Sequence, residues 1–230
     1  MDDLNIKYYQ ELATLYSKDE LKTFDSPITQ FNSQIPLGDV AEIGFGMGHS
    51  AVYFASQNRN VTCFDAYQST FDLLVEKFAN EPFIGNLNFS LMDNLPILGD
   101  KKYAVIVLEN ILHFYKPSDV RKFCNNIIKN LVPNGLISVI NHHVDSELAD
   151  SYNTPFDNDT LLDCFQADQF ECLFLDLLKN TGYEKEHQAW INVIERITDE
   201  SERKHYMDQM IGVQNHVYQR AIFRRVCQKF

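Results

Sequence analysis

The chain has 230 residues, enough for one sizeable α/β domain, and its hydrophobic content of 45% is ordinary for a globular protein. Its formal net charge of −12 would repel phosphate backbones, so nucleic acid is not expected as a partner. No apolar run approaches the roughly 18 residues that a membrane span needs, and the first residues lack the apolar core of a secretory signal. Five cysteines without a Cys-x-x-Cys pair argue against a disulfide framework or zinc site and favour a cytoplasmic location.

A helix is predicted near the start of the chain, within residues 1–36, which precede the first core strand. Apolar side chains recur there at helical spacing and form one stripe, made of Ile6, Tyr9, Leu12, Leu15 and Tyr16.

A strand, a glycine-rich turn and a second helix follow. The apolar residues 40–43 are typical of a buried parallel strand, and residues 50–57 are predicted to form a helix. Between them, Gly44, Gly46 and Gly48 lack side chains, which allows positive φ angles and close approach of a ligand to the backbone. Because a helix N-terminus faces the same space, this arrangement predicts a site for a nucleotide-type ligand.

The spacing of these glycines distinguishes between the known nucleotide-binding motifs. A dinucleotide fold would place its third glycine at position 49, which is His49, and a Walker loop would need a lysine that is absent here. The motif Glu42-x-Gly44-x-Gly46-x-Gly48 instead resembles motif I of the class I S-adenosylmethionine (SAM)-dependent methyltransferases. A tight strand-to-helix turn that binds no ligand is the alternative.

An acidic residue follows the next predicted strand, residues 61–64. Asp65 lies about 20 residues beyond the glycines, where a carboxylate accepts hydrogen bonds from both hydroxyls of a ribose. Ala66 would then lie beside the adenine. The alternative for Asp65 is the N-cap of a helix predicted over residues 67–79.

The resemblance implies further cofactor contacts after the next two strands. A predicted strand over residues 87–91 runs into Met92 and Asp93, where the family has an acid that binds the adenine amino group. A carboxylate can only accept hydrogen bonds and suits that donor, and an Asx-turn is the alternative. The apolar run 103–108 predicts a central strand, and Asn110 beyond it would lie near the methionine part of SAM.

Three histidines near the expected ligand crevice are candidates for catalysis. His113 follows the central strand, either as a packing and hydrogen-bonding group or as a base. His142 and His143 follow a predicted fifth strand, residues 136–140, at the edge where open α/β sheets bind ligands. They are candidates for substrate contact or a general base, and a polar surface loop is the alternative. Since adjacent side chains of an extended chain diverge, no metal site is expected.

The connection before the fifth strand carries another family feature. Ser118 and Asp119 are predicted to cap a helix that ends before a Pro-Asn-Gly turn at residues 133–135. This turn resembles the post-motif turn of the family, with Asn134 in place of a glycine. Asparagine tolerates left-handed geometry, so the turn is expected to be preserved.

The second half of the chain is expected to complete the sheet. Residues 142–169 are polar and acidic with interspersed aromatic residues, and form either a substrate-side insertion or a solvated loop. We predict a crossover helix over 170–180, a sixth strand over 188–194, a helical insertion over about 198–216 and a seventh strand over 218–226.

Alternating strands and helices predict an α/β, Rossmann-like fold with helices on both faces of a mostly parallel sheet. The resemblance implies seven strands in the order 3-2-1-4-5-7-6, with strand 7 antiparallel. It also implies that residues 1–36 form an N-terminal helical lid, or a plain buttress, and that residues 37–230 form the methyltransferase domain.

The resemblance implies methyl transfer from SAM to an oxygen, nitrogen or carbon atom of a small molecule, with S-adenosylhomocysteine (SAH) as product. Transfer from a sulfonium needs mainly positioning and desolvation, so the motifs describe the cofactor and not the acceptor. A protein or RNA methyltransferase and a non-catalytic SAM-binding or scaffold domain are the alternatives. The implied cofactor residues are Glu42, Gly44, Phe45, Gly46, Gly48, Asp65, Ala66, Met92, Asp93 and Asn110, and the catalytic candidates are His113, His142 and His143.

Overall fold

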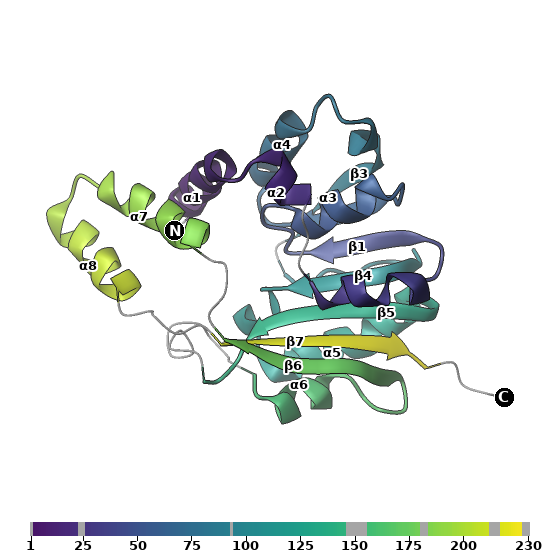
Figure 1. Cartoon of the computed structure of the whole chain (residues 1–230). Helices are drawn as coiled ribbons and strands as arrows, with labels where there is room; N and C mark the ends of the chain where they lie inside the picture. Colours follow the sequence, from purple (N-terminus) through teal and green to yellow (C-terminus); the bar gives the residue numbers. More distant parts are fainter. Residues whose placement is uncertain are drawn as a thin grey trace.

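The computed structural model describes residues 2–22, 26–92, 94–145, 156–179, 184–211 and 217–226. Its seven strands form one sheet in the order β3-β2-β1-β4-β5-β7-β6 (Figure 1). β7 is antiparallel to both of its neighbours, and the other adjacent strands pair in parallel. The predicted Rossmann-like fold and strand order are therefore confirmed. The strands are β1 (Asp39–Ile43), β2 (Val61–Asp65), β3 (Leu87–Leu91), β4 (Tyr103–Glu109), β5 (Leu131–His142), β6 (Phe170–Lys179) and β7 (Val217–Arg225).

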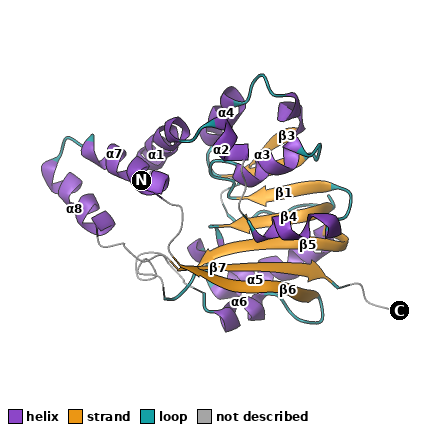
Figure 2. Ribbon diagram, in the orientation of Figure 1, coloured by secondary structure: helices purple, strands orange, loops and turns teal. Residues whose placement is uncertain are grey.

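Helices lie on both faces of this sheet (Figure 2). Among the described residues, no helix is both long and apolar enough to cross a membrane. The α-helices are α1 (Asp2–Leu15), α2 (Lys18–Lys22), α3 (His49–Ser56), α4 (Gln68–Lys77), α5 (Pro117–Ile127), α6 (Asn158–Cys164), α7 (Glu184–Glu195) and α8 (Glu200–Ile211). Short 3₁₀ helices are η1 (Pro27–Gln34), η2 (Pro82–Asn86), η3 (Leu112–Phe114) and η4 (Ile128–Asn130).

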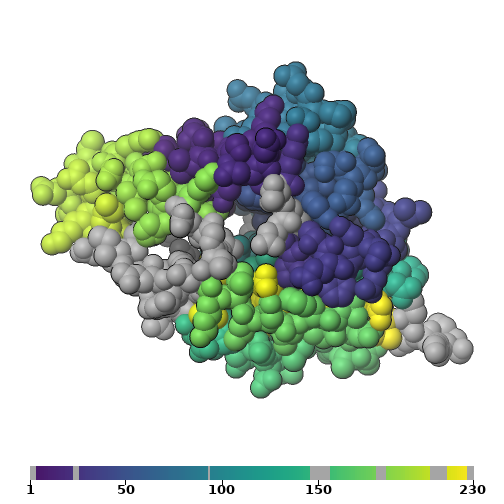
Figure 3. Space-filling model, viewed as in Figure 1, coloured from purple at the N-terminus to yellow at the C-terminus, as the bar shows by residue number. Residues whose placement is uncertain are grey.

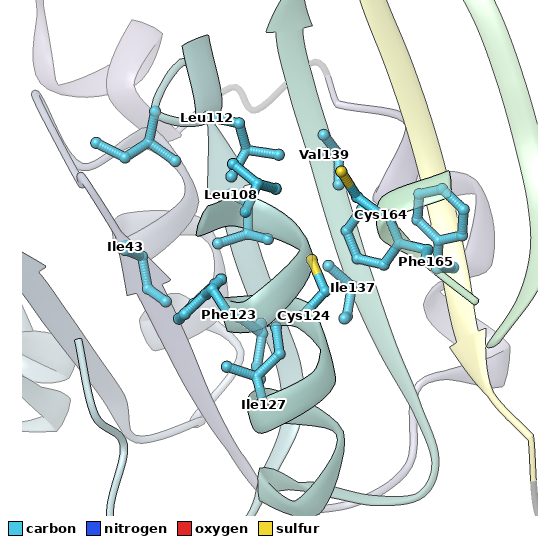
Figure 4. Close-up of a cluster of buried hydrophobic side chains, with 14 of the residues drawn as sticks. Ile43, Leu108, Leu112, Phe123, Cys124, Ile127, Ile137, Val139, Cys164 and Phe165 are labelled. Carbon is cyan, nitrogen blue, oxygen red and sulfur yellow. The ribbon is translucent and has the colours of Figure 1, made fainter. Parts of the chain in front are cut away.

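The central strands are buried on both sides, as their continuous apolar sequence predicts. On one face, α5 and α6 pack against β4 and β5, with Phe123, Cys124 and Cys164 facing Leu108 and Val139 (Figure 4). On the other face of the sheet, a second cluster of buried hydrophobic side chains packs the strands against η1, α1, α3 and α4. The period-2 alternation of side chains therefore divides the core into two layers.

Two elements of the second half differ from the prediction. Residues 170–180, predicted as a crossover helix, form strand β6, because a run of apolar residues this short fits either structure. Pairing with β7 decides it: Arg220 forms an ion pair with Asp176 at 2.6 Å, and Arg224 forms one with Glu171 at 2.5 Å. These two contacts cross between the strands, where only an extended chain brings the partners opposite each other.

The prediction of a strand over residues 188–194 is also wrong, because these residues lie inside helix α7. Ala189 and Val193 are both buried and lie on one helical face at i and i+4. The helical insertion between β6 and β7 consequently includes α7 as well as the predicted α8. The sheet keeps the expected order because β6 occupies the place assigned to the sixth strand.

The predictions around β5 are met in part. Helix α5 begins at Pro117 after Lys116, so Ser118 and Asp119 are not its N-cap. Asn134 has a φ of 60°, which is the left-handed geometry expected of this position. Residues 146–155, in the predicted insertion 142–169, lie outside the described residues.

Candidate functional site

The candidate site lies at the carboxyl ends of β1, β2, β4 and β5, beneath α1 and α7 (Figure 1). The turn from β1 to α3 contains the three predicted glycines, whose φ angles are 71° at Gly44, 51° at Gly46 and 73° at Gly48. The predicted left-handed backbone is confirmed, and glycine adopts it at no steric cost.

The three glycines serve different purposes. A Cβ at Gly44 would lie 2.8 Å from Ile111, and one at Gly48 would lie 2.7 Å from Leu74, so these two positions are required by packing inside the protein. At Gly46 the nearest atoms would be the ring Cε1 and the hydroxyl of Tyr9, both at 3.8 Å. Gly46 is thus the glycine that leaves room on the ligand side, and the Tyr9 ring covers that side.

Asp65 joins the glycine turn to the turn after β2. Its carboxylate accepts the Gly46 N–H at 3.3 Å and the Tyr67 N–H at 3.2 Å, and its side chain is buried. Burial raises the pKa of Asp65, and the backbone donors oppose that rise. Tyr67 is the N-cap of α4, so the alternative role of Asp65 as the helix cap is excluded. The Gly46 and Tyr67 N–H groups supply two of the roughly four hydrogen bonds that a carboxylate can accept.

The other residues predicted to contact adenosine differ in how far their side chains are exposed. Phe45 is buried against Phe71 and Phe89, so only its backbone faces the turn. Ala66 is exposed beside Asp65, whereas Met92 is buried and its N–H donates to the Asp65 carbonyl at 2.9 Å. Asp93 lies outside the described residues.

Two buried acceptor atoms lie at the ends of neighbouring strands. Glu42 on β1 is 5% exposed, and among the described residues its Oε2 atom has no hydrogen-bond partner. The same holds, within that described part, for Oδ1 of Asn110, which follows β4 with a φ of 55°. Buried acceptors that lack a donor are uncommon in folded proteins. Both atoms would be satisfied by a donor-rich, cationic ligand group such as an ammonium.

Sequence reasoning missed Glu109, the last residue of β4. Its carboxylate accepts hydrogen bonds from the hydroxyls of Ser26 at 2.8 Å, Ser138 at 3.0 Å and Ser50 at 3.2 Å. Burial raises the pKa of Glu109 and the three serines oppose it, while burial and then the charge of Glu109 raise the pKa of Glu42. An acid that ends a strand buried on both faces was the available signal in the sequence.

The two acids make stability depend on pH. Because the folded-state pKa of Glu42 is raised, its contribution to stability is full below the unfolded pKa of about 4.3 and is lost as pH rises towards the folded value. Glu42→Gln removes this loss. We expect its unfolding free energy, relative to the wild type, to be higher at pH 8 than at pH 5 by about 1 kcal/mol or more. Urea melts at both pH values measure this, with exposed Glu76→Gln as control; an equal difference at both pH values would contradict the assignment.

The structure brings two of the three predicted histidines together. His113 is buried in η3. Its backbone N–H donates to Oδ1 of Asn141 at 2.9 Å, and its ring Nδ1 lies 3.1 Å from the same oxygen. Because an amide oxygen only accepts, the hydrogen bond assigns the proton to Nδ1 and the lone pair to Nε2. Burial lowers the pKa of His113 to about 4, so the ring is neutral at pH 7.

His142 lies beside this ring, and its neighbour His143 does not. The ring centroids of His113 and His142 are 4.6 Å apart, and that of Tyr218 on β7 lies 4.8 Å from His142. His143 instead has its Nδ1 3.3 Å from a carboxylate oxygen of Asp145. Adjacent residues of a strand point to opposite faces, which separates the two side chains. Within the part of the chain that is described, no His, Cys, Asp and Glu side chains form a group that could hold a metal.

A Rossmann-like sheet in this strand order, with a glycine turn after its first strand and an acid at the end of its second, is typical of the class I methyltransferase fold. Residues 40–135 match the family model described as a methyltransferase domain. The resemblance predicted from the motifs is thus confirmed over this part of the chain.

Individual proteins resemble this chain in sequence or in structure. The ubiquinone biosynthesis O-methyltransferase of Rickettsia akari (strain Hartford) is 28% identical over 113 residues, which are 48% of this chain and 43% of the relative. The chain spans less than half the length of the curated relatives it matches. TehB from Haemophilus influenzae superposes with a TM-score of 0.66 at 15% identity, covering 90% of this chain and 65% of TehB. The N-methyltransferase NodS from Bradyrhizobium japonicum, solved with SAH, superposes with a TM-score of 0.56 at 12% identity, covering 95% and 98%.

Proposed function

We propose that this chain is a SAM-dependent methyltransferase that acts on a small molecule. The proposal rests on polar groups at the carboxyl ends of neighbouring strands. Asp65 accepts a hydrogen bond from the Gly46 N–H, and Glu42 and Asn110 provide the buried acceptor atoms. SAM carries two complementary parts, a ribose with two hydroxyl donors and an amino acid with an ammonium. The matching domain and the SAH bound by NodS support the same cofactor.

The described residues fit such a cofactor. Asp65 would accept from the ribose hydroxyls, and Glu42 and Asn110 would accept from the ammonium, with Glu109 adding negative charge beside them. Ala66, Met92 and Asp93 remain our predicted contacts to the adenine. When bound, SAM supplies an activated methyl group on a sulfonium, so the protein mainly has to orient the reactants and exclude water.

The names of the curated relatives support an oxygen atom as the methyl acceptor. A hydroxyl acceptor must lose its proton as the new bond to oxygen forms. The rings of His113 and His142, with centroids 4.6 Å apart, place imidazole nitrogen atoms side by side at the carboxyl end of the sheet. We therefore propose His113 and His142 as the catalytic pair, and His143, which faces Asp145, remains a separate candidate.

Methyl transfer from tritiated SAM to fractions of a cell extract tests this function. We expect label in a dialysable product that chromatography separates from SAM. Label in protein or RNA would favour the alternative acceptors, and SAH binding without any transfer would favour a binding or scaffold domain. SAH binding is measured in parallel by calorimetry. A folded chain that ignores SAH at millimolar concentration would refute the proposal.

The histidine assignment makes a separate prediction. His113→Gln and His142→Gln should each lower kcat for a hydroxyl acceptor roughly 100-fold or more, while the affinity for SAH stays within about twofold. His205→Gln, on the exposed surface of α8, is the control for changing a histidine. If His143→Gln alone removed activity, the grouping of His113 with His142 would be the wrong choice.

A further inference from the structure

Helices α1 and α7 form one cap over the candidate site, although they lie far apart in the sequence. Figure 1 shows the two helices side by side, and in Figure 3 their purple and yellow-green surfaces meet. The ring of Tyr8 stacks on Trp190 at a centroid distance of 4.4 Å and an interplanar angle of 15°. Aromatic pairs of this kind add to the energy of burial, so the stack contributes to holding the helices together.

Polar contacts join the same two helices. Glu11 on α1 accepts a hydrogen bond from the side-chain amide of Asn192 at 2.7 Å and forms an ion pair with Arg196 at 2.8 Å. Just after α1, the hydroxyl of Tyr16 donates to Glu186 of α7 at 2.6 Å. We call these contacts, with the Tyr8–Trp190 stack, the α1–α7 clasp.

The residue next to Tyr8 reaches the cofactor residues. The rings of Tyr8 and Tyr9 pack edge to face at 5.1 Å, and the ring and hydroxyl of Tyr9 lie against Gly46. Burial and then the negative charge of Asp65 raise the pKa of Tyr9. On the same helix, the side-chain amide of Asn5 donates to the Tyr67 hydroxyl at 3.3 Å.

We propose that Tyr9 is a plug on the nucleoside site, held in place by the α1–α7 clasp, and that SAM or SAH enters only when the cap swings away. The inference rests on the proposed function. The Tyr9 ring and hydroxyl lie 3.8 Å from the position that a Cβ on Gly46 would occupy. A ligand atom between the ring and the turn would need about 3.5–4.0 Å on each side, and the gap does not provide that space. The ligand and the Tyr9 ring therefore compete for one place, next to Asp65.

Competition of this kind has a measurable consequence. If only the open state binds, the apparent Kd is the intrinsic Kd divided by the open fraction, so weakening the plug tightens binding. Tyr9→Ala removes the plug, and Glu11→Gln weakens the clasp by removing one charge of the pair with Arg196. Both variants should bind SAH more tightly than the wild type, because SAH associates with them faster.

The chain provides its own probe, because Trp190 is its only tryptophan and lies in the clasp. Stopped-flow mixing with SAH, followed by tryptophan fluorescence, gives the association rate, and calorimetry gives the Kd. We expect roughly threefold or more faster association and tighter binding for Tyr9→Ala, and a smaller gain for Glu11→Gln. Gln10→Ala, exposed on the same helix, should behave like the wild type.

The outcomes separate this inference from the function on which it rests. Unchanged or weaker SAH binding by folded Tyr9→Ala and Glu11→Gln overturns the plug and leaves the methyltransferase proposal intact. No SAH binding by any folded variant overturns both. Thermal melts of each variant establish that it is folded.

Discussion

Asp65→Ala is expected to lower the affinity for SAH roughly 10- to 100-fold, or about 1.5–3 kcal/mol, the range for a lost hydrogen bond to a charged group. The structure adds a second reason for a large effect. The carboxylate of Asp65 also accepts the N–H groups of Gly46 and Tyr67, so its loss releases the glycine turn as well as the ribose. Calorimetric titration of the folded variant with SAH measures the change.

Asp65→Asn separates these two contributions. The amide keeps the size of the side chain and one acceptor oxygen but loses the charge, so it can still accept from one backbone donor. We expect an affinity between those of the wild type and Asp65→Ala. Wild-type affinity in Asp65→Ala would refute the ribose contact. The burial that raises the pKa of Asp65 also predicts weaker SAH binding in acid, because a protonated carboxyl accepts fewer hydrogen bonds.

Gly44→Ala is expected to cost about 2–5 kcal/mol of stability without any ligand present. The new Cβ would lie 2.8–3.2 Å from three side-chain atoms of buried Ile111, and the φ of 71° would be strained for alanine. For a domain of this size each kcal/mol lowers Tm by roughly 2–4 °C, so we expect a fall of roughly 5–15 °C in a thermal melt.

Two other glycines provide the comparison. A Cβ on Gly85 would meet no atom within 4 Å, so Gly85→Ala should leave Tm nearly unchanged. Gly46→Ala should cost less than Gly44→Ala, since its closest neighbour would be Tyr9 at 3.8 Å and only the φ of 51° opposes it. Equal destabilisation by Gly44→Ala and Gly85→Ala would show that Ile111 moves aside and that packing does not require the glycine.

The local signals in the sequence located the first part of the site. An apolar run followed by alternate glycines predicted β1, the turn and α3, and the left-handed φ angles follow from the absence of a Cβ. Asp65 was found because an acid that closes a short apolar strand lies at the strand's carboxyl end. The sheet order came from the resemblance, and it holds even though one strand was predicted in the wrong place.

The second half shows where local pattern fails. Residues 170–179 and 184–195 are both short segments in which apolar residues satisfy a helical and an extended spacing about equally well. Pairing with β7 makes the first a strand, and packing against α1 makes the second a helix. In both cases the partner lies elsewhere in the chain, so no window around the segment contains the deciding interaction.

The sequence by itself determined the β1–glycine turn–α3 unit and the acid after β2, because each depends on residues adjacent in the chain. Only the tertiary structure decided which groups share the site. It brought Ser26, Ser50 and Ser138 onto Glu109, set His113 beside His142, and laid Tyr9 over Gly46. These contacts join residues that are far apart in the chain, and side-chain periodicity carries no information about which distant elements meet.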